Sequence, residues 1–470
     1  MACTTVIVGK KATIDGSTMA GRNVDTFGPY CPQRAIVVPA NNHQSGNYVS
    51  NMNGFTCPYP EHAYRYQLVP NVDIKKEGIY GESGFNEKNV AMSATESFYA
   101  NEDSLANDPL VTKGGIAEDS ITVITLPYIN SARDGVARLG KMIEKYGSAE
   151  GNGVIFSDKD DVWYMEILTG HHWVARRIPD DSYAVIANQI AIENVDFNDT
   201  DNYMWSTGIR EYVEKYHLNP DEDRWCVRHI FGTDVELDRH YNYPRVWFGQ
   251  RYLNPEIDQA IDSKHMPMCR KPSRKIKVSD VQYILRSHYN ETPFDPYGSG
   301  DEKQKHMYRP VGLNRTQNSH VLQCRNDVPA EEACIMWINM GIPEYTPYLP
   351  FYANATDTDS SFNDTKLTWN FDDAYWFYRT VTTEVEAHYN ENQPNNVKFL
   401  KATREMIYGM ITATDEHAKS LSGEELTKYL TQRNHEIAQA VRTKTMEYMN
   451  TVVQNNISLS KLTFTMDPSL

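Results

Sequence analysis

The sequence lacks the features that mark membrane, secreted and nucleic-acid-binding proteins. In its 470 residues, no run approaches the roughly 18 consecutive apolar residues that a membrane-spanning helix needs. The N-terminus has neither the basic segment nor the apolar run of a signal peptide, so we expect a cytoplasmic protein. Positive charge is scarce, because 46 Lys and Arg stand against 62 Asp and Glu, for a net charge of −16. This balance argues against nucleic acid or an anionic membrane as a partner.

Cysteine motifs and compositional bias are also missing. The seven cysteines are an odd number and no two of them form a C-x-x-C pair, which fits neither a disulfide framework nor a zinc ribbon. The 26 Gly and 23 Pro follow no period, which excludes a collagen-like repeat. Hydrophobic residues make up 40% and aromatics 11% of the chain, too much for a disordered protein. We therefore expect a soluble, globular protein with a large core.

Turn signals and hydrophobic periodicity predict strands interleaved with helices. We expect a hairpin of strands 4–8 and 17–23 around Asp15-Gly16, further strands at 90–95 and 121–126, and an antiparallel meander at 153–157, 162–167, 172–177 and 183–187. We expect helices at 131–146, around 279–285 and near 373–389, followed by a C-terminal pair of amphipathic helices. This order predicts an α+β fold in which helices cover antiparallel sheets.

Cys3 is the most informative residue. Only Met1 and Ala2 precede it, so removal of two residues would place a thiol and a free α-amine on one amino acid. An α-amine has an unperturbed pKa of about 7.7–8.0 and can act as the general base for the thiol. The ordinary alternative, which we favour for the other six cysteines, is a small buried hydrophobic residue.

The return strand of the predicted hairpin carries Arg22 and Asp25. The hairpin brings both near the start of the first strand, where a cation lowers a thiol pKa and a carboxylate holds an ammonium group. Taken alone, the pair would be an ordinary surface ion pair, which contributes little to stability. Its placement beside Cys3 makes it a candidate for the catalytic site.

A series of short motifs makes the chain resemble the N-terminal-nucleophile cysteine hydrolases, and most closely the bacterial dipeptidase A (PepD) type. The resemblance runs from Cys3 past Tyr352. It is carried by Ala2-Cys3-Thr4-Thr5, Asp15-Gly16-Ser17-Thr18, Arg22-Asn23-Val24-Asp25, Gly84-Phe85-Asn86-Glu87, Ala91-Met92-Ser93-Ala94-Thr95-Glu96, Val185-Ile186-Ala187-Asn188-Gln189, Tyr243-Pro244-Arg245-Val246-Trp247, His288-Tyr289, Thr292-Pro293-Phe294-Asp295 and Arg315-Thr316-Gln317. A single motif would be weak evidence, but this order of motifs is specific.

The resemblance implies a four-layer αββα fold and a cysteine dipeptidase that works through a thioester acyl-enzyme, without a cofactor. Cys3 looks like the nucleophile, Arg22 the cation beside it and Asp25 the carboxylate near the amine. Asn188 looks like an oxyanion donor, and the backbone N–H of Thr95 is our candidate for the second. A late arginine that binds substrate is either Arg245 or Arg251, and the sequence does not decide between them.

Two other functions stay open. The related bile-salt hydrolases and penicillin V acylases share the nucleophile, so the chain could hydrolyse acyl amides instead. It could also be a non-catalytic binding protein with the same fold if Cys3 is never exposed. We expect dipeptides as substrates and a homo-oligomeric assembly, with no nucleic acid or membrane partner.

The remaining features favour ordinary interpretations. Acidic segments 196–201 and 357–364 lack the pattern of a calcium loop, and the basic run within 270–277 is typical of a solvated face. His171-His172 lies in a strand pattern that would point the two rings to opposite faces, so no metal site is predicted. We divide the chain into a propeptide at 1–2 that is removed, by autocatalysis in our prediction, a hydrolase domain at 3–390 and a helical extension at 391–470.

Overall fold

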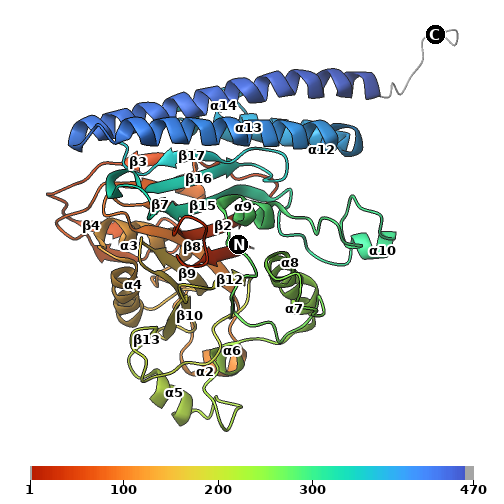
Figure 1. Ribbon diagram of the computed structural model, residues 1–470. Helices are drawn as coiled ribbons and strands as arrows, with labels where there is room; N and C mark the ends of the chain where they lie inside the picture. Colours follow the sequence, from red (N-terminus) through yellow and green to blue (C-terminus); the bar gives the residue numbers. More distant parts are fainter. Residues whose placement is uncertain (1–2, 461–470) are drawn as a thin grey trace.

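Two antiparallel sheets form the centre of the molecule, as seen in a computed structural model that describes residues 3–460 (Figure 1). The first sheet has seven strands in the order β14 (Cys269–Arg270), β12 (Tyr183–Ile186), β1 (Thr4–Val8), β2 (Thr18–Asp25), β15 (Thr316–Cys324), β16 (Cys334–Met340) and β17 (Leu349–Tyr352). The second has six in the order β13 (Tyr203–Trp205), β11 (Trp173–Arg177), β10 (Val162–Ile167), β9 (Gly151–Ser157), β8 (Ala91–Phe98) and β7 (Ser83–Phe85).

Helices cover the outer face of each sheet. The second sheet is covered by α3 (Glu118–Thr125) and α4 (Ala132–Tyr146), and the first by α8 (Tyr243–Leu253), α9 (Val278–Arg286), α12 (Ala374–Ala387), α13 (Tyr389–Ala418) and α14 (Gly423–Leu459). Figure 1 shows α13 and α14 as two long neighbouring helices beside β16 and β17. The predicted α+β fold with four αββα layers is therefore confirmed.

Shorter elements connect these layers. Two small antiparallel sheets pair β3 (Ile36–Val38) with β6 (Tyr66–Leu68) and β4 (Asn47–Val49) with β5 (Thr56–Pro58). The short helices are α1 (Ile74–Glu77), α2 (Glu102–Asn107), η1 (Leu126–Tyr128), α5 (Ile209–Lys215), α6 (Val227–Phe231), α7 (Glu236–Tyr241), α10 (Glu302–Lys305), η2 (Ala330–Glu332) and α11 (Ser360–Asn363). Among the described residues, no helix is both long and apolar enough to cross a membrane.

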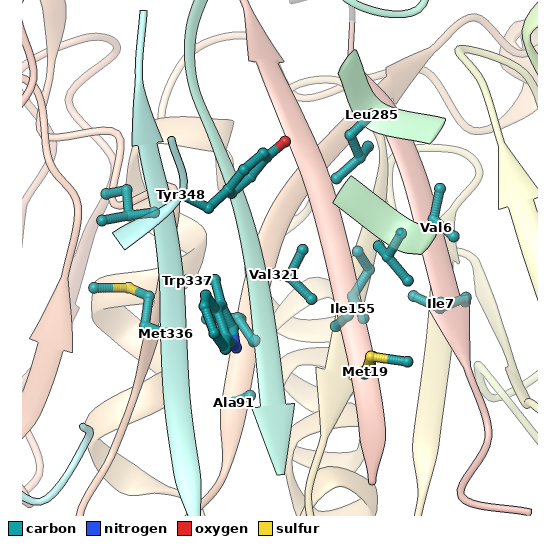
Figure 2. Packing of buried hydrophobic residues seen from close by; sticks show 14 of the residues in the cluster. Val6, Ile7, Met19, Ala91, Ile155, Leu285, Val321, Met336, Trp337 and Tyr348 are labelled. Carbon is teal, nitrogen blue, oxygen red and sulfur yellow. The ribbon is translucent and has the colours of Figure 1, made fainter. Parts of the chain in front are cut away.

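Apolar side chains fill the space between each sheet and its helices, and some of them belong to strands of both sheets. On the first sheet, α9 packs against β1, β2 and β15. Figure 2 shows this packing, with Leu285 of α9 near the strands that carry Val6 and Val321. Side chains of α12, α13 and α14 belong to the same hydrophobic cluster as β16 and β17. Whether the chain divides at residue 390 into a domain and an extension stays a prediction, and the predicted propeptide 1–2 lies outside the described residues.

Several predicted elements are confirmed. The β1–β2 hairpin turns at Gly16, which has a φ of +76°, and Asp15 Oδ1 accepts a hydrogen bond from the Ser17 backbone N–H at 3.1 Å. Helix α4 begins after Ser131, whose side chain accepts from the Asp134 N–H. The predicted helices near 279–285 and 373–389 correspond to α9 and α12, and the C-terminal pair to α13 and α14.

Two predictions are wrong. The apolar run 121–126 is mostly the helix α3, which is buried along its whole length, and periodicity cannot distinguish a short, fully buried helix from a strand. The last strand of the predicted meander, β12, leaves β11 and pairs with β1 in the other sheet, while β13 takes the place beside β11. The alternation of apolar and polar residues indicates which face of a strand is buried, but it does not indicate which strand pairs with it. His171 and His172 precede β11 and bond Asp108 and Ser206 respectively.

Candidate active site

A layer of polar side chains lies between the two sheets at the start of β1. The strand registers place Thr5 opposite Arg22 and Arg22 opposite His320, so the three side chains share one face of adjacent strands. Arg22 Nε donates to Ser93 Oγ of β8 in the other sheet, at 2.8 Å. The shared face of the first sheet therefore points toward the second sheet, and Cys3, two residues before Thr5, lies at its edge.

The Arg22 guanidinium is held beside the Cys3 thiol. Its Nη1 lies 3.2 Å from Cys3 Sγ, which confirms the placement expected from the hairpin. The other acceptors of the guanidinium are Thr95 O at 2.9 Å, Ala94 O at 2.6 Å, Glu82 O at 2.8 Å and Glu82 Oε2 at 2.7 Å. Cys3 and Arg22 are both fully buried. With this many partners, the cation has little freedom to move from the sulfur.

A chain of hydrogen bonds fixes the Arg22 side chain from its other side. Ser93 Oγ lies 2.9 Å from His320 Nε2, and His320 Nδ1 lies 2.9 Å from Asn318 Oδ1. Burial and the neighbouring Arg22 charge hold the His320 pKa well below its usual range, so the ring is neutral. Nδ1 therefore donates to Asn318, Nε2 accepts from Ser93, and Ser93 Oγ accepts from Arg22.

The thiol is protonated at neutral pH in the 470-residue chain. Burial raises the pKa of Cys3 to about 12, Arg22 lowers it, and the carboxylates of Glu96 and Asp25 raise it further. A nearby cation is thus insufficient to produce a thiolate here. Formation of a thiolate at Cys3 needs a base, and a free α-amine on the same residue would supply one.

Asn188 follows the end of β12 by two residues, and Arg245 contacts both Asn188 and the Cys3 carbonyl. The β1–β12 ladder pairs Thr5 with Ile186 at its end, so Cys3 and Asn188 lie just beyond the same end of the ladder. Arg245 Nη2 donates to Asn188 Oδ1 at 2.8 Å, and Asn188 Nδ2 donates to Ser97 O at 2.8 Å. The bond from Arg245 fixes which end of the Asn188 amide carries the N–H donors.

Arg245 is fully buried, and its N–H groups all go to acceptors of the protein. They contact Tyr241 O, Cys3 O, Thr4 Oγ1, Asn188 Oδ1 and Asn242 Oδ1. These contacts favour a role in positioning over the expected contact with substrate. The other candidate, Arg251, is exposed on α8, with its guanidinium 5.4 Å from the centre of the Trp247 ring.

Asp25 is engaged by two residues. Its Oδ2 accepts from Arg309 and its Oδ1 from Thr316, which lies opposite Asp25 across the β2–β15 ladder. Arg309 was missed by the sequence analysis, because it lies in a loop outside the quoted motifs. Only the tertiary structure brings it to β2.

Thr95 lies at an irregularity in β8. The β8–β9 ladder pairs Ala94 with Val154 and Glu96 with Gly153, which leaves Thr95 without an opposite residue. Its carbonyl accepts from Arg22, and its Oγ1 lies 3.5 Å from Ser97 Oγ. A bulge of this kind places a backbone N–H outside the regular ladder, as the predicted oxyanion role requires.

Two buried carboxyl groups of the same layer were also missed. Glu96 Oε2 accepts from Thr5 Oγ1 at 2.8 Å, and Glu166 accepts from the backbone N–H groups of Ala191 and Ile192. Burial raises the pKa of each to about 7. Glu96 belongs to one of the motifs that carry the family resemblance, but its spacing in the sequence gave no reason to assign it a role of its own beside Thr95.

Among residues 3–460, one group of side chains has metal-ligand spacing. Ligand atoms of Asp221, Cys226 and His229 lie within 4.8 Å of one another, far along the chain from the Cys3 layer. Asp221 Oδ2 already accepts from Arg224 Nε at 2.9 Å and pairs with His229 Nδ1 at 2.8 Å. These bonds account for the group as a surface ion-pair cluster.

Comparison with known proteins assigns the chain to a family. A probable dipeptidase of Latilactobacillus sakei is 51% identical over 469 residues, covering 100% of this chain and 98% of that protein. Dipeptidase A of Lactobacillus helveticus is 36% identical, covering 98% of both. A conjugated bile acid hydrolase structure from Clostridium perfringens has 12% identity, covers 72% of this chain and 89% of its own, and has a TM-score of 0.31, too low to support an argument. Residues 2–402 match Peptidase family C69, and the chain therefore belongs to this family.

Proposed function

We propose that the protein is a cysteine dipeptidase whose nucleophile is Cys3. The observation that carries this proposal is the buried contact of 3.2 Å between Cys3 Sγ and Arg22 Nη1 at the start of β1. The family assignment supports peptide hydrolysis, and two relatives named as probable dipeptidases align with 100% and 96% of the chain. Loss of Met1 and Ala2 would create the amine that activates the thiol.

The reaction then proceeds in two halves. The Cys3 amine takes the thiol proton, and the thiolate attacks the carbonyl carbon of the dipeptide. The ammonium so formed gives its proton to the leaving nitrogen as the peptide bond breaks, which leaves a thioester on Cys3. The amine next takes a proton from water, whose oxygen attacks the thioester. As the C–S bond breaks, the ammonium returns this proton to the sulfur, which releases the first amino acid and restores both the thiol and the amine.

The oxyanion of both tetrahedral intermediates needs donors close to Cys3. Asn188 Nδ2 is our candidate on the first sheet, because Arg245 orients its amide. The Thr95 N–H is our candidate on the second sheet, because β8 departs from regular pairing there. A preorganised donor typically contributes about 2.7–4 kcal/mol of transition-state stabilisation.

Purified protein tests this proposal directly. The intact mass should lack Met1 and Ala2, and a panel of free dipeptides should be hydrolysed while glycine-conjugated bile salts and penicillin V are not. Cys3→Ser should abolish turnover, whereas Cys269→Ser, at a half-buried cysteine of β14, should retain it. Activity on the acyl amides alone would establish the alternative hydrolase, and an untrimmed chain without turnover would establish a binding protein.

A further inference from the structure

Glu96 is a buried carboxyl group with one oxygen that has no partner. The residue is 1% exposed, and its Oε2 accepts from Thr5 Oγ1. Its Oε1 has no hydrogen-bond partner, and no cation lies within ion-pair distance of the carboxylate among residues 3–460. Burial of a carboxylate without a cation is costly, so a native protein rarely keeps one without a use.

The position of Glu96 places this oxygen near the nucleophile. Thr5 follows Cys3 by two residues, so the two side chains lie on the same face, about 6.6–6.8 Å apart along the strand. The carboxylate of Glu96 bonds Thr5 from the opposite sheet. The electrostatic effect of Glu96 on the Cys3 thiol shows the same proximity.

The two nearest arginines are committed elsewhere. The charges of Arg22 and Arg245 lower the pKa of Glu96. The hydrogen bonds of Arg22, however, go to Cys3, Ser93, Glu82 and the carbonyls of β8. Those of Arg245 go to Asn188 and to the other acceptors named above. Neither arginine therefore contacts Glu96 Oε1. A cation that enters with the substrate would find this oxygen unoccupied.

Tyr164 supplies a second unsatisfied oxygen at the same place. The β8–β9 register puts Gly153 opposite Glu96, and an added Cβ on Gly153 would lie 2.0 Å from Tyr164 Oη. Glycine is therefore required there for the Tyr164 ring to lie over β9, between Glu96 on β8 and Glu166 on β10. Tyr164 Oη is buried and has no hydrogen-bond partner among the described residues.

We propose that Glu96, with Tyr164 Oη, binds the free α-ammonium group of the dipeptide. In a dipeptide this nitrogen is two bonds from the carbonyl carbon that Cys3 attacks, so its partner must lie within a few ångströms of the thiol. An ammonium group has three donors and matches two unsatisfied acceptors in one place. Asp25 fits this task less well, because Arg309 and Thr316 already occupy its two oxygens. The inference rests on the proposed dipeptidase function and gives it a determinant of substrate length.

Glu96→Gln tests the inference, since the amide keeps an acceptor for Thr5 and removes the charge. For a free dipeptide, kcat/KM should fall about 30-fold or more, as expected for loss of a desolvated charge pair. The matched ligand carries hydrogen in place of the α-ammonium group, and its kcat/KM should change less than about threefold. If this ligand is not cleaved, its Ki as an inhibitor of free-dipeptide hydrolysis should change less than about threefold instead. Tyr164→Phe should give a smaller loss that is also confined to the free dipeptide.

Glu332→Gln is the matched control, because Glu332 of η2 is a carboxyl group that is 2% exposed and whose charged neighbours, Asp415 and Arg325, lie outside the Cys3 layer. Its effect should be equal on the two ligands. An equal loss for both ligands in Glu96→Gln, or no loss for either, overturns the inference. The parent protein separates this failure from failure of the proposed function: if it cleaves free dipeptides and loses activity on alkylation of Cys3, the function stands whatever Glu96 does.

Discussion

The Arg22 guanidinium joins the Cys3 thiol on one side to Glu82 on the other, at 3.2 Å from the sulfur and 2.7 Å from the carboxylate. Arg22 and Glu82 are 0% and 1% exposed, so this ion pair is fully desolvated. The cation that faces the Cys3 thiol is therefore also a major structural contact between the two sheets.

Arg22→Met should destabilise the protein and inactivate it. Removal of one partner leaves Glu82 buried without a cation, which typically costs about 3–5 kcal/mol in the free energy of unfolding. Urea denaturation measures this loss. The double variant Arg22→Met/Glu82→Gln should recover much of the stability without recovering activity, and recovery of both would show that Arg22 has no role at the thiol.

Removal of the first two residues should depend on the Cys3 thiol. In the proposed step, the sulfur attacks the Ala2 carbonyl carbon and the C–N bond to Cys3 breaks, which forms a thioester and frees the Cys3 amine. Water then cleaves the thioester and releases the N-terminal residues as an acid. The intact mass of Cys3→Ala should retain Ala2, whereas Cys269→Ala should be trimmed like the parent. A trimmed Cys3→Ala protein would assign the step to another protease.

Arg245→Met should lower kcat more than it raises KM, because its contacts orient Asn188 and the Cys3 carbonyl. Loss of a correctly placed oxyanion donor typically lowers kcat about 10²- to 10³-fold, so Asn188→Ala should resemble Arg245→Met. Steady-state kinetics on a free dipeptide and its C-terminal amide separate this role from carboxylate binding. If Arg245 binds the substrate carboxylate instead, Arg245→Met should hydrolyse the free dipeptide as slowly as the parent protein hydrolyses the C-terminal amide.

The free energy of unfolding should depend on pH because of Glu96. Its pKa is raised by burial from 4.5 to about 7 in the folded state, so folding favours the protonated form. The resulting stability is fully present below pH 4.5 and is lost as pH rises to about 7. Glu96→Gln should therefore gain stability relative to the parent across this window, by up to roughly 3 kcal/mol at pH 8. Urea unfolding of both proteins at pH 5 and pH 8 measures the gain, and a constant difference would contradict it.

The local sequence was sufficient to predict that Arg22 lies beside Cys3. Asp15-Gly16 specifies a tight turn, and a short turn between two apolar strands fixes their register. That register alone brings Arg22 and Asp25 back toward Cys3. The helices α4 and α9 were predictable for a similar reason, since each shows a periodic apolar face, and α4 also has a capping residue at Ser131.

The rest of the site depended on the tertiary structure. Ser93, Glu96, Asn188, Arg245 and Arg309 reach the Cys3 layer from four separate parts of the chain. Alternation of side chains along a strand records which face is buried, but not which strand lies beside it, so β12 was placed in the wrong sheet. Whether a buried polar group is paired or left with an unsatisfied oxygen depends on neighbours distant in sequence. The hairpin therefore determined where Cys3 and Arg22 lie, and the packing of one sheet on the other determined which groups surround them.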